Sequence, residues 1–168
     1  MPSGNYFAWQ KVTNGVQAFS STYKTTDTTD DAIAQIAGSE PWFGWVAYDA
    51  PHSPFHEPPS DLHSFDLSGS PSDAVLYHAM VEALDTELGR LLAAVDLNDT
   101  TVIFLGDNGT PSDVTETPFL PNHAKRTLYE GGVNTPLIVA GQAVAAGAVG
   151  QQSEALVEAT DLLATVLE

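Results

Sequence analysis

The stretch Thr101-Val-Ile-Phe-Leu-Gly-Asp-Asn-Gly109 decides the fold class of this chain. Five β-prone residues lead directly into an acid and an amide, Asp107 and Asn108, at the end of a buried strand. The flanking glycines let the backbone turn sharply there. Ligands of open α/β sheets gather at the carboxyl ends of strands, and Ca²⁺ and Mg²⁺ prefer oxygen donors. The pattern indicates either a cation site on these two side chains or an ordinary Asp-Asn-Gly turn.

Apolar runs of strand length alternate with helical patterns along the rest of the chain. The run 42–48 is almost continuously apolar, which is typical of a strand buried on both faces of a parallel sheet. The alternation predicts an α/β fold, a mainly parallel sheet flanked by helices, in a single domain over residues 1–168. The sequence predicts strands over 42–48, 101–105 and 136–140, helices over 31–37 and 73–94, an amphipathic segment within 153–168, and an irregular leading segment over 1–27 with one short strand.

The charge balance is strongly acidic, with 22 acidic residues, five basic residues and a formal net charge of −17. Such a chain repels phosphate backbones, so nucleic acid is excluded as a partner, and an anionic membrane surface is disfavoured. The basic residues include one adjacent pair, Lys125 and Arg126. This pair is either a local anion-binding spot or ordinary surface charge.

The sequence also excludes several kinds of site and segment. Because it contains no cysteine, it has no disulfide, thiolate metal site or cysteine nucleophile. No window approaches the roughly 18 uninterrupted apolar residues that indicate a transmembrane helix. Residues 1–7 lack a basic region followed by an apolar run, so they are not a signal peptide.

Three polar segments each lie next to a predicted strand, and together they identify a family. They are Ala-Pro-His-Ser-Pro-Phe-His-Glu-Pro-Pro over 50–59, Gly-Asp-Asn-Gly over 106–109, and His-Ala-Lys-Arg-Thr-Leu-Tyr-Glu-Gly-Gly-Val-Asn-Thr-Pro over 123–136. In this order and spacing they resemble the sulfatase family of the alkaline-phosphatase superfamily. The segments 25–33, 77–85, 88–92 and 161–167 resemble the same family. The resemblance covers 22–168, and 1–21 is a poorly matched leading segment.

The resemblance implies a role for four residues. Asp107 and Asn108 match the family's acid–amide metal pair, whose ion is Ca²⁺ or Mg²⁺. Lys125 matches the lysine that contacts the sulfate group, and a compact ammonium suits that role as a point charge. His52 matches the histidine that contacts the sulfate ester and helps to protonate the leaving alcohol; without the family, a histidine between prolines is better explained as a loop cap. The implied substrate is a sulfate ester, such as a sulfated carbohydrate or an aryl sulfate.

The other conspicuous side chains have simpler expected roles. Arg126 is expected at the surface or at the substrate rim, and Tyr129 and Glu130 are expected to support their loop. Trp42 and Trp45 are expected in the core. The histidines without a secure counterpart in the family are expected at the surface, and these are His56, His63 and His123.

The sequence lacks the family's nucleophile and part of its metal site. That nucleophile is a formylglycine made from the first residue of a Cys/Ser-x-Pro-x-Arg motif, and Ser70-Pro-Ser72 lacks the arginine. The paired aspartates that complete the metal site are also absent, and Asp107 with Asn108 cannot form a tight Ca²⁺ site alone. The chain therefore resembles the C-terminal part of an incomplete sulfatase catalytic domain, to be completed by an N-terminal part that supplies neighbouring strands for an otherwise unpaired sheet edge.

We therefore expect the 168-residue chain alone to hydrolyse an aryl sulfate no faster than the buffer does. The measurement is release of the phenol with and without Ca²⁺ or Mg²⁺. Clear metal-dependent hydrolysis by this chain would contradict the expected incompleteness.

Two other functions fit the same residues. One is a phosphatase or phosphodiesterase of the same superfamily, because the loops at the metal edge are shared. The other is a catalytically dead module that binds anions or carbohydrate through Lys125. The compartment stays open, because an export signal would lie in the missing part; relatives in the family suggest a periplasmic or secreted protein.

Overall fold

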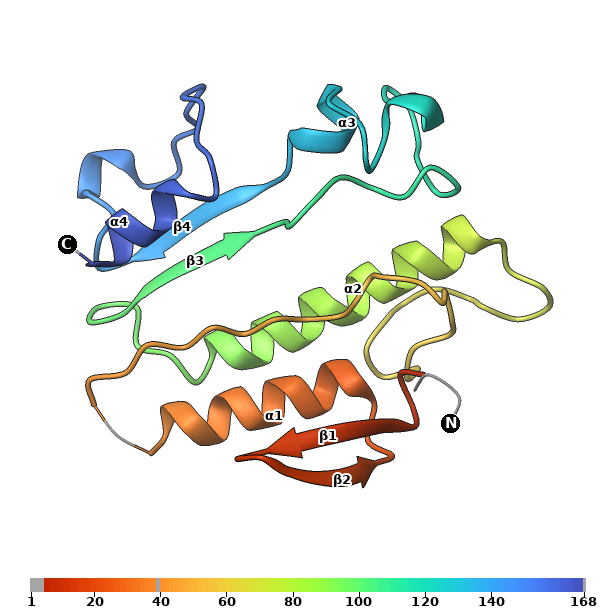
Figure 1. Cartoon of the computed structure of the whole chain (residues 1–168), viewed down its shortest axis with the longest axis horizontal. Coiled ribbons are helices and arrows are strands. Elements are labelled where there is room, and N and C mark those ends of the chain that lie inside the picture. Colours follow the sequence, from red (N-terminus) through yellow and green to blue (C-terminus); the bar gives the residue numbers. More distant parts are fainter. Residues whose placement is uncertain (1–4, 39, 168) are drawn as a thin grey trace.

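A computed structural model of the chain describes residues 5–38 and 40–167. The first four residues of the leading segment, part of the stretch judged not to be a signal peptide, lie outside this description. The helices and strands are β1 (Trp9–Thr13), β2 (Val16–Ser20), α1 (Lys24–Ile36), α2 (Asp73–Leu92), β3 (Thr101–Leu105), α3 (Glu130–Val133), β4 (Leu137–Gly141) and α4 (Asp161–Leu167), with single 3₁₀ turns η1 (Pro121–His123) and η2 (Ala146–Ala148). Figure 1 shows the β1–β2 hairpin beside α1, α1 beside α2, and β3–β4 beyond α2. Within the described part of the chain, no helix has the length and apolar character needed to cross a membrane.

The α/β character is as predicted, but the mainly parallel sheet is wrong. The described residues form two sheets, each two-stranded and antiparallel: β1 with β2, and β3 with β4. In the second sheet Thr101 lies opposite Gly141 and Leu105 lies opposite Leu137. The predicted strands at 101–105 and 136–140 are therefore present to within a residue, and they pair with each other rather than with parallel neighbours.

The predicted strand over 42–48 is also wrong. These residues run extended through the structure (Figure 1) but belong to neither sheet. Trp45 is 77% exposed, so its assignment to the core is wrong, whereas Trp42 is half-buried. An apolar extended run becomes a strand only when a neighbour pairs with its backbone N–H and C=O groups, and no described strand does so.

Helix α1 begins seven residues earlier than the helix predicted over 31–37. Threonine disfavours helix interiors, and residues 25–29 are threonine-rich, so the sequence pattern points away from a helix there. Tertiary contacts overrule that preference. Thr26 donates to the Glu87 carboxylate of α2 at 2.7 Å, and the Thr29 hydroxyl lies 2.9 Å from the Tyr48 hydroxyl. Helix α2 is close to its prediction and is capped by Ser72, whose hydroxyl accepts from the Val75 N–H.

A buried carboxylate joins the two long helices. The Glu87 side chain is 2% exposed and accepts hydrogen bonds from Nε and Nη2 of Arg90, at 2.9 and 2.7 Å. Arg90 extends the pair to α1, because its Nη1 lies 2.7 Å from the Asp30 carboxylate. A small apolar core is formed by Tyr6, Tyr23, Ala50 and Met80, against which Phe55, Leu62 and Leu84 pack.

The β1–β2 hairpin is attached to α1 by a second buried acid, Asp27. Its carboxylate accepts from the Lys11 ammonium at 2.5 Å and from the Ser20 hydroxyl at 2.5 Å. Burial alone raises the pKa of the Asp27 carboxyl, but the hydrogen bonds from Lys11 and Ser20 outweigh it, so that its pKa is lowered. The ionised carboxylate therefore stabilises the folded chain.

This lowered pKa leads to a prediction for Asp27→Asn. The folded-state pKa lies below the unfolded-state pKa of about 3.9, so the stabilisation is complete above that value and is lost as the pH falls through the folded pKa. At pH 7 we expect the variant to lose about 1–3 kcal/mol of unfolding free energy, and the deficit should shrink below about pH 4. Urea unfolding at a series of pH values measures it, with the exposed Asp85→Asn as control. A deficit for Asp27→Asn that does not change with pH would contradict the assignment.

Candidate active site

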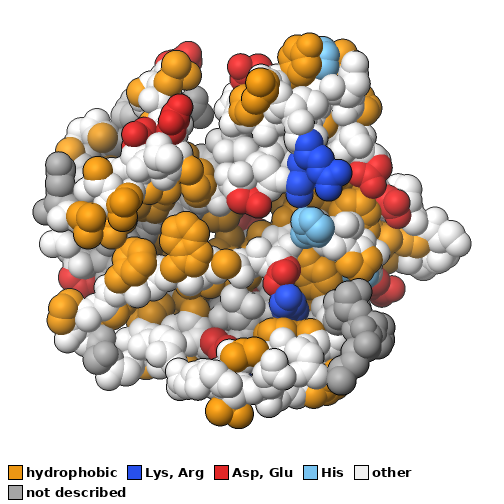
Figure 2. All heavy atoms as spheres, viewed as in Figure 1, with side chains coloured by type: hydrophobic (Ala, Val, Ile, Leu, Met, Phe, Trp, Pro, Cys, Tyr) orange, Lys and Arg blue, Asp and Glu red, His pale blue; other side chains and the backbone are white. Residues whose placement is uncertain are grey.

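The four residues predicted to form the site line a single cavity of about 270 Å³. They come from three loops that are far apart in the sequence: His52 from the loop after 42–48, Asp107 and Asn108 from the end of β3, and Lys125 from the loop before α3. The cavity is completed by Tyr48, Asp49, Ala50, Pro51, Tyr77, Gly109 and Pro111. On the face shown in Figure 2, basic side chains and a histidine gather next to acidic ones.

Asp107 and Asn108 are held in place by backbone contacts to the segment that enters β4. The Gly106 N–H donates to the Pro136 carbonyl at 3.0 Å, and the Gly109 N–H donates to the Gly132 carbonyl at 3.1 Å. Glycine is required at 109, because a Cβ there would lie 1.9 Å from the Gly131 carbonyl oxygen. This close approach brings the turn after β3 against the loop that carries Lys125.

Lys125 sits in a tight turn anchored on both sides. Its N–H donates to the Thr110 carbonyl at 3.0 Å, and the buried Ala124 accepts at its carbonyl from the N–H and hydroxyl of Thr127. Arg126, the next residue, has a left-handed φ of 74°. This backbone turn directs the Lys125 and Arg126 side chains away from each other. Lys125 consequently lines the cavity, whereas Arg126 is exposed and is not among the lining residues, in keeping with its expected surface position.

The backbone of His52 is fixed and its imidazole is oriented. Its N–H donates to the Asp49 carbonyl and its carbonyl accepts from the Tyr6 hydroxyl, both at 2.8 Å. Burial, with smaller contributions from Asp49 and Tyr23, raises the pKa of Tyr6, so this hydroxyl keeps its proton. The Nδ1 atom lies 2.8 Å from the Ser53 carbonyl. Because a carbonyl can only accept, Nδ1 carries a proton and Nε2 is the atom left for a ligand.

Two lining residues were missed by the sequence reasoning. Asp49 lines the cavity, and its carboxylate lies 2.7 Å from the Lys24 ammonium. The rule that identified Asp107 applies to Asp49 as well, since both acids follow an apolar extended run. Tyr77 comes from α2, where its ring packs edge-on against Phe55. No sequence signal distinguishes it from the other residues on that helix.

The three histidines interpreted as surface residues, His56, His63 and His123, are all half-buried. His56 packs against the Tyr6 ring at 4.2 Å, and burial lowers its pKa although its Nδ1 contacts the Pro54 carbonyl. Both ring nitrogens of His63 are shielded from solvent. His123 is half-buried and stacks on Tyr129 at 3.6 Å. None of the three lines the cavity.

The oxygen donors of the cavity do not amount to a metal site on their own. Asp107 and Asn108 supply a carboxylate and an amide, and the second acidic group of the cavity, Asp49, is paired with Lys24. Within residues 5–38 and 40–167, no three His, Cys, Asp or Glu side chains cluster closely enough to hold an ion. Ca²⁺ takes six to eight oxygens, so the donors present do not fit a complete site for it.

Comparisons with known proteins give a consistent family. The sequence model of the Sulfatase family matches residues 3–168. A curated relative, described as "Uncharacterized sulfatase YdeN" of Escherichia coli (strain K12), is 29% identical over 129 residues, which are 70% of this chain and 22% of that protein.

Solved structures agree with that match. Ps i-CgsB has a TM-score of 0.64 at 26% identity, and the same protein in complex with k-i-k-neocarrahexaose has a TM-score of 0.62 at 24% identity. Each comparison covers 77% of this chain and 30% of the other chain, so the chain spans less than a third of the length of these relatives. With the family match extending over residues 3–168, the chain belongs to the sulfatase family.

Proposed function

We propose that this chain forms the oxyanion-binding part of a sulfatase active site, and that it acts in the hydrolysis of sulfate esters once residues from outside these 168 complete the site. The observation that supports this is the meeting of His52, Asp107, Asn108 and Lys125 around one cavity. Three loops separated by tens of residues meet there, and a cavity of about 270 Å³ has room for a tetrahedral oxyanion and part of its ester group.

The charges of the cavity favour an anion at one position. Of the described residues that line it, Lys125 alone carries a fixed positive charge. On a chain of net charge −17, a sulfate group is repelled from most of the surface, so this local ammonium determines where it binds. The ammonium is a point charge that contacts sulfate oxygens and stabilises charge as it develops on them.

His52 is placed to act on the leaving alcohol. With Nδ1–H committed to the Ser53 carbonyl, Nε2 is the ring atom that would donate a proton to the ester oxygen. The Tyr6 hydroxyl and the Asp49 carbonyl fix the main chain on both sides of the ring. The transfer therefore needs no rearrangement of the loop.

Asp107 and Asn108 are proposed as two ligands of a Ca²⁺ or Mg²⁺ ion whose remaining oxygen donors come from outside this chain. In support of this, Asp107 and Asn108 follow the end of β3 and line the same cavity as Lys125. Since these donors alone do not fit the ion, no step of the reaction is derived through it.

The proposed substrate class is a sulfated carbohydrate, with aryl sulfates as the simpler test substrates. The support is the structural relative whose complex contains k-i-k-neocarrahexaose. The cavity is open to solvent at His52, which is exposed, so an extended ester group can leave the pocket on that side.

Titration of the labelled chain with inorganic sulfate and with 4-nitrophenyl sulfate, followed by NMR, tests this function. We expect the largest shifts at the amides of His52, Asn108 and Lys125. Lys125→Ala should weaken binding by about tenfold to a hundredfold, the loss of one charge-assisted contact.

Arg126→Ala is the matched control, because it removes the same charge from the adjacent residue outside the cavity. It should leave the affinity within about twofold, as expected for screened surface charge. Equal weakening by both variants would mean that only net charge matters, and the proposed site would be wrong.

A further inference from the structure

Among the described residues that line the active-site cavity, Tyr77 alone belongs to a helix. Along α2, Tyr77, Met80, Leu84 and Glu87 recur at the three- and four-residue spacing of one helix face. Met80 and Glu87 are buried, and Leu84 packs against the apolar core. Tyr77, one turn before Met80, is half-buried and faces the cavity instead. The buried face of α2 therefore ends at the site with a tyrosine.

The hydroxyl of Tyr77 is available to a ligand. The other tyrosine that lines the cavity, Tyr48, has its hydroxyl 2.9 Å from the Thr29 hydroxyl. By contrast, the Tyr77 hydroxyl has no hydrogen-bond partner within the part of the chain that the structure describes. Its ring is nevertheless fixed, because it packs edge-on against Phe55 with the ring centroids 5.8 Å apart. A fixed phenol with an unpaired hydroxyl is suited to orient a ligand.

A carboxylate oxygen of Asp49 is also available in the cavity. Its Oδ2 atom lies 2.7 Å from the Lys24 ammonium, whereas Oδ1 has no partner among the described residues. The ion pair offsets the charge of the acid, so Asp49 repels an anionic ligand less, while Oδ1 can still accept a hydrogen bond. The Asp49 carbonyl accepts from the His52 N–H at 2.8 Å. The acid therefore lies next to the residue assigned to the ester oxygen.

These two groups match the chemistry of a sugar better than that of a simple aryl group. A sugar carries hydroxyls on the carbons next to its sulfate ester, and each hydroxyl can donate to a carboxylate or accept from a phenol. A group such as 4-nitrophenyl has no hydroxyl to offer. It would shield Tyr77 and Asp49 from water without replacing their hydrogen bonds, which costs binding free energy.

We propose that Tyr77 and Asp49 determine the specificity of this site, each by contacting a sugar hydroxyl near the sulfate ester. The Tyr77 hydroxyl donates to one sugar oxygen, and Oδ1 of Asp49 accepts from a sugar hydroxyl. This role of the two residues rests on the proposed function, because it takes Lys125 as the contact of the sulfate group. It also assigns the choice of the ester group to residues that differ from those that hold the sulfate.

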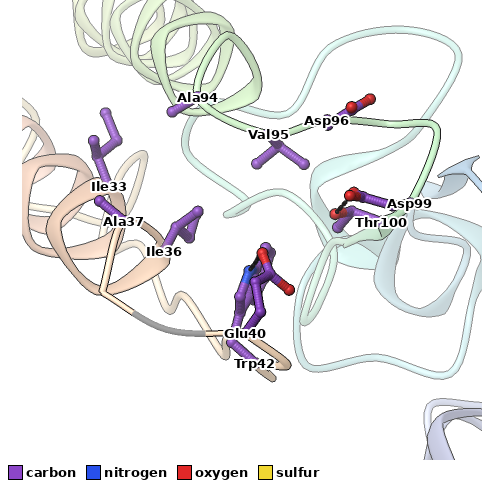
Figure 3. Close-up of a pocket in the computed structure, with 10 residues that line it drawn as sticks. All are labelled: Ile33, Ile36, Ala37, Glu40, Trp42, Ala94, Val95, Asp96, Asp99 and Thr100. Carbon is purple, nitrogen blue, oxygen red and sulfur yellow. Dashed lines mark hydrogen bonds between the residues drawn. The ribbon is translucent and has the colours of Figure 1, made fainter.

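A second cavity of about 260 Å³ does not compete for such a ligand. It lies beside the C-terminal ends of α1 and α2, and Figure 3 shows the acids Glu40, Asp96 and Asp99 around it. Two of these acids accept hydrogen bonds from their neighbours, Glu40 from the Trp42 indole and Asp99 from the Thr100 hydroxyl. None of the described residues that line this cavity is basic, so it repels a sulfated sugar. The indole N–H of Trp42 is thus an internal control for nonspecific binding.

NMR titration of the full labelled chain tests this role with four ligands. They are inorganic sulfate, 4-nitrophenyl sulfate, glucose 3-sulfate and its epimer galactose 3-sulfate, and the sugar sulfates carry a hydroxyl on each carbon next to the ester. We expect the better sugar sulfate to bind about fivefold or more tightly than the aryl sulfate. It should shift the amides of Asp49 and Tyr77 in addition to those shifted by inorganic sulfate, and the Trp42 indole should not shift.

Tyr77→Phe removes the hydroxyl and keeps the ring that packs against Phe55. We expect it to weaken binding of the sugar sulfate by about fivefold to tenfold and to leave inorganic sulfate within about twofold. Tyr129→Phe is the matched control, because Tyr129 is not among the residues that line the cavity, and it should change neither affinity. Asp49→Asn loses the charge of the acceptor and should lower the preference for the sugar sulfate over inorganic sulfate by about threefold or more.

Deoxy forms of the better sugar sulfate separate a contact of Tyr77 from a structural role. Each form lacks one of the two hydroxyls that neighbour the ester. One of them should bind the parent chain about fivefold more weakly than the complete sugar, and it should lose little further affinity in Tyr77→Phe, since the contact is already absent. If each deoxy form loses the same affinity in both chains, no such contact exists and the assignment of Tyr77 is wrong.

The remaining outcomes separate this specificity role from the proposed function. Sulfate binding that depends on Lys125, without any preference for a sugar sulfate over the aryl sulfate, would overturn the role of Tyr77 and Asp49 and leave the sulfate site in place. Equal weakening of all ligands by Tyr77→Phe would do the same, since the residue would then act on the cavity as a whole. If no ligand shifts the amide of Lys125, the proposed function is wrong and the specificity role is lost with it.

Discussion

Gly109→Ala is expected to lower the free energy of unfolding by more than about 3 kcal/mol. A Cβ at this position would lie 1.9 Å from the Gly131 carbonyl oxygen and 2.8 Å from the Gly132 Cα, and both of these are backbone atoms. The clash can be relieved only by separating the turn after β3 from the 131–132 backbone, which breaks the hydrogen bond from Gly109 to Gly132. The melting temperature should fall by about 6–12 °C in a chain of this size.

The same substitution at Gly89 is the control. Gly89 lies within α2, and a Cβ there meets nothing within 4 Å, so alanine should raise the stability by about 0.5–1 kcal/mol. The site gives a second readout. Because the contact of Gly109 holds the Lys125 loop against the turn after β3, Gly109→Ala should also lose the sulfate-induced shift of Lys125. Similar melting temperatures for the two variants would contradict the close approach.

Arg90→Ala is expected to cost about 2–4 kcal/mol of unfolding free energy, because it leaves a buried carboxylate without its cation. Glu87 is 2% exposed, and without Arg90 the Thr26 hydroxyl is, among the described residues, the one donor left to it. The variant also loses the contact from Arg90 to Asp30, which joins α2 to α1. Urea unfolding at neutral pH measures the loss.

A double variant separates the unpaired charge from the lost packing of the arginine. In Arg90→Ala/Glu87→Gln the buried group is a neutral amide that still accepts from Thr26, so part of the stability should return. Arg126→Ala, at an exposed arginine, should stay within about 0.5 kcal/mol of the parent chain. If the double variant is less stable than Arg90→Ala, the cost comes from packing, and the buried-charge argument is wrong.

The sequence pattern predicted a strand or helix correctly where the segment that it packs or pairs with lies in the same chain. The strand over 101–105 was predicted from its apolar run, and β4 supplies its partner from the same chain. Helix α2 was predicted from apolar spacing and from the turn-forming residues ahead of it. The site residues were named from motif resemblance, and the structure places all of them around one cavity, a convergence that no local pattern encodes.

The sequence pattern failed where a contact with a residue distant in the sequence determines the secondary structure or the burial of a side chain. In the threonine-rich start of α1, the Thr26 hydroxyl donates to the Glu87 carboxylate of α2 and the Thr29 hydroxyl contacts the Tyr48 hydroxyl, and neither contact is encoded by the local pattern. Likewise, His56 lies in an aromatic cluster with Tyr6 and Tyr23, whose positions are set by the fold of the leading segment. Asp49 was missed although it follows the 42–48 segment, because only the fold brings this acid into the cavity that Asp107 also lines.

The amino-acid sequence by itself determined the apolar runs, the long helix that begins at residue 73, the acidic net charge and the family motifs, since these depend on residue type and spacing alone. Tertiary structure decided that β3 pairs antiparallel with β4, that 42–48 stays unpaired, and that Lys125 meets Asp107 through the glycine contact at 109. The physical reason is that backbone pairing and close approach need a specific neighbour. A run of apolar residues indicates that the segment must be buried, but it does not determine which other segment of the chain buries it or pairs with its backbone.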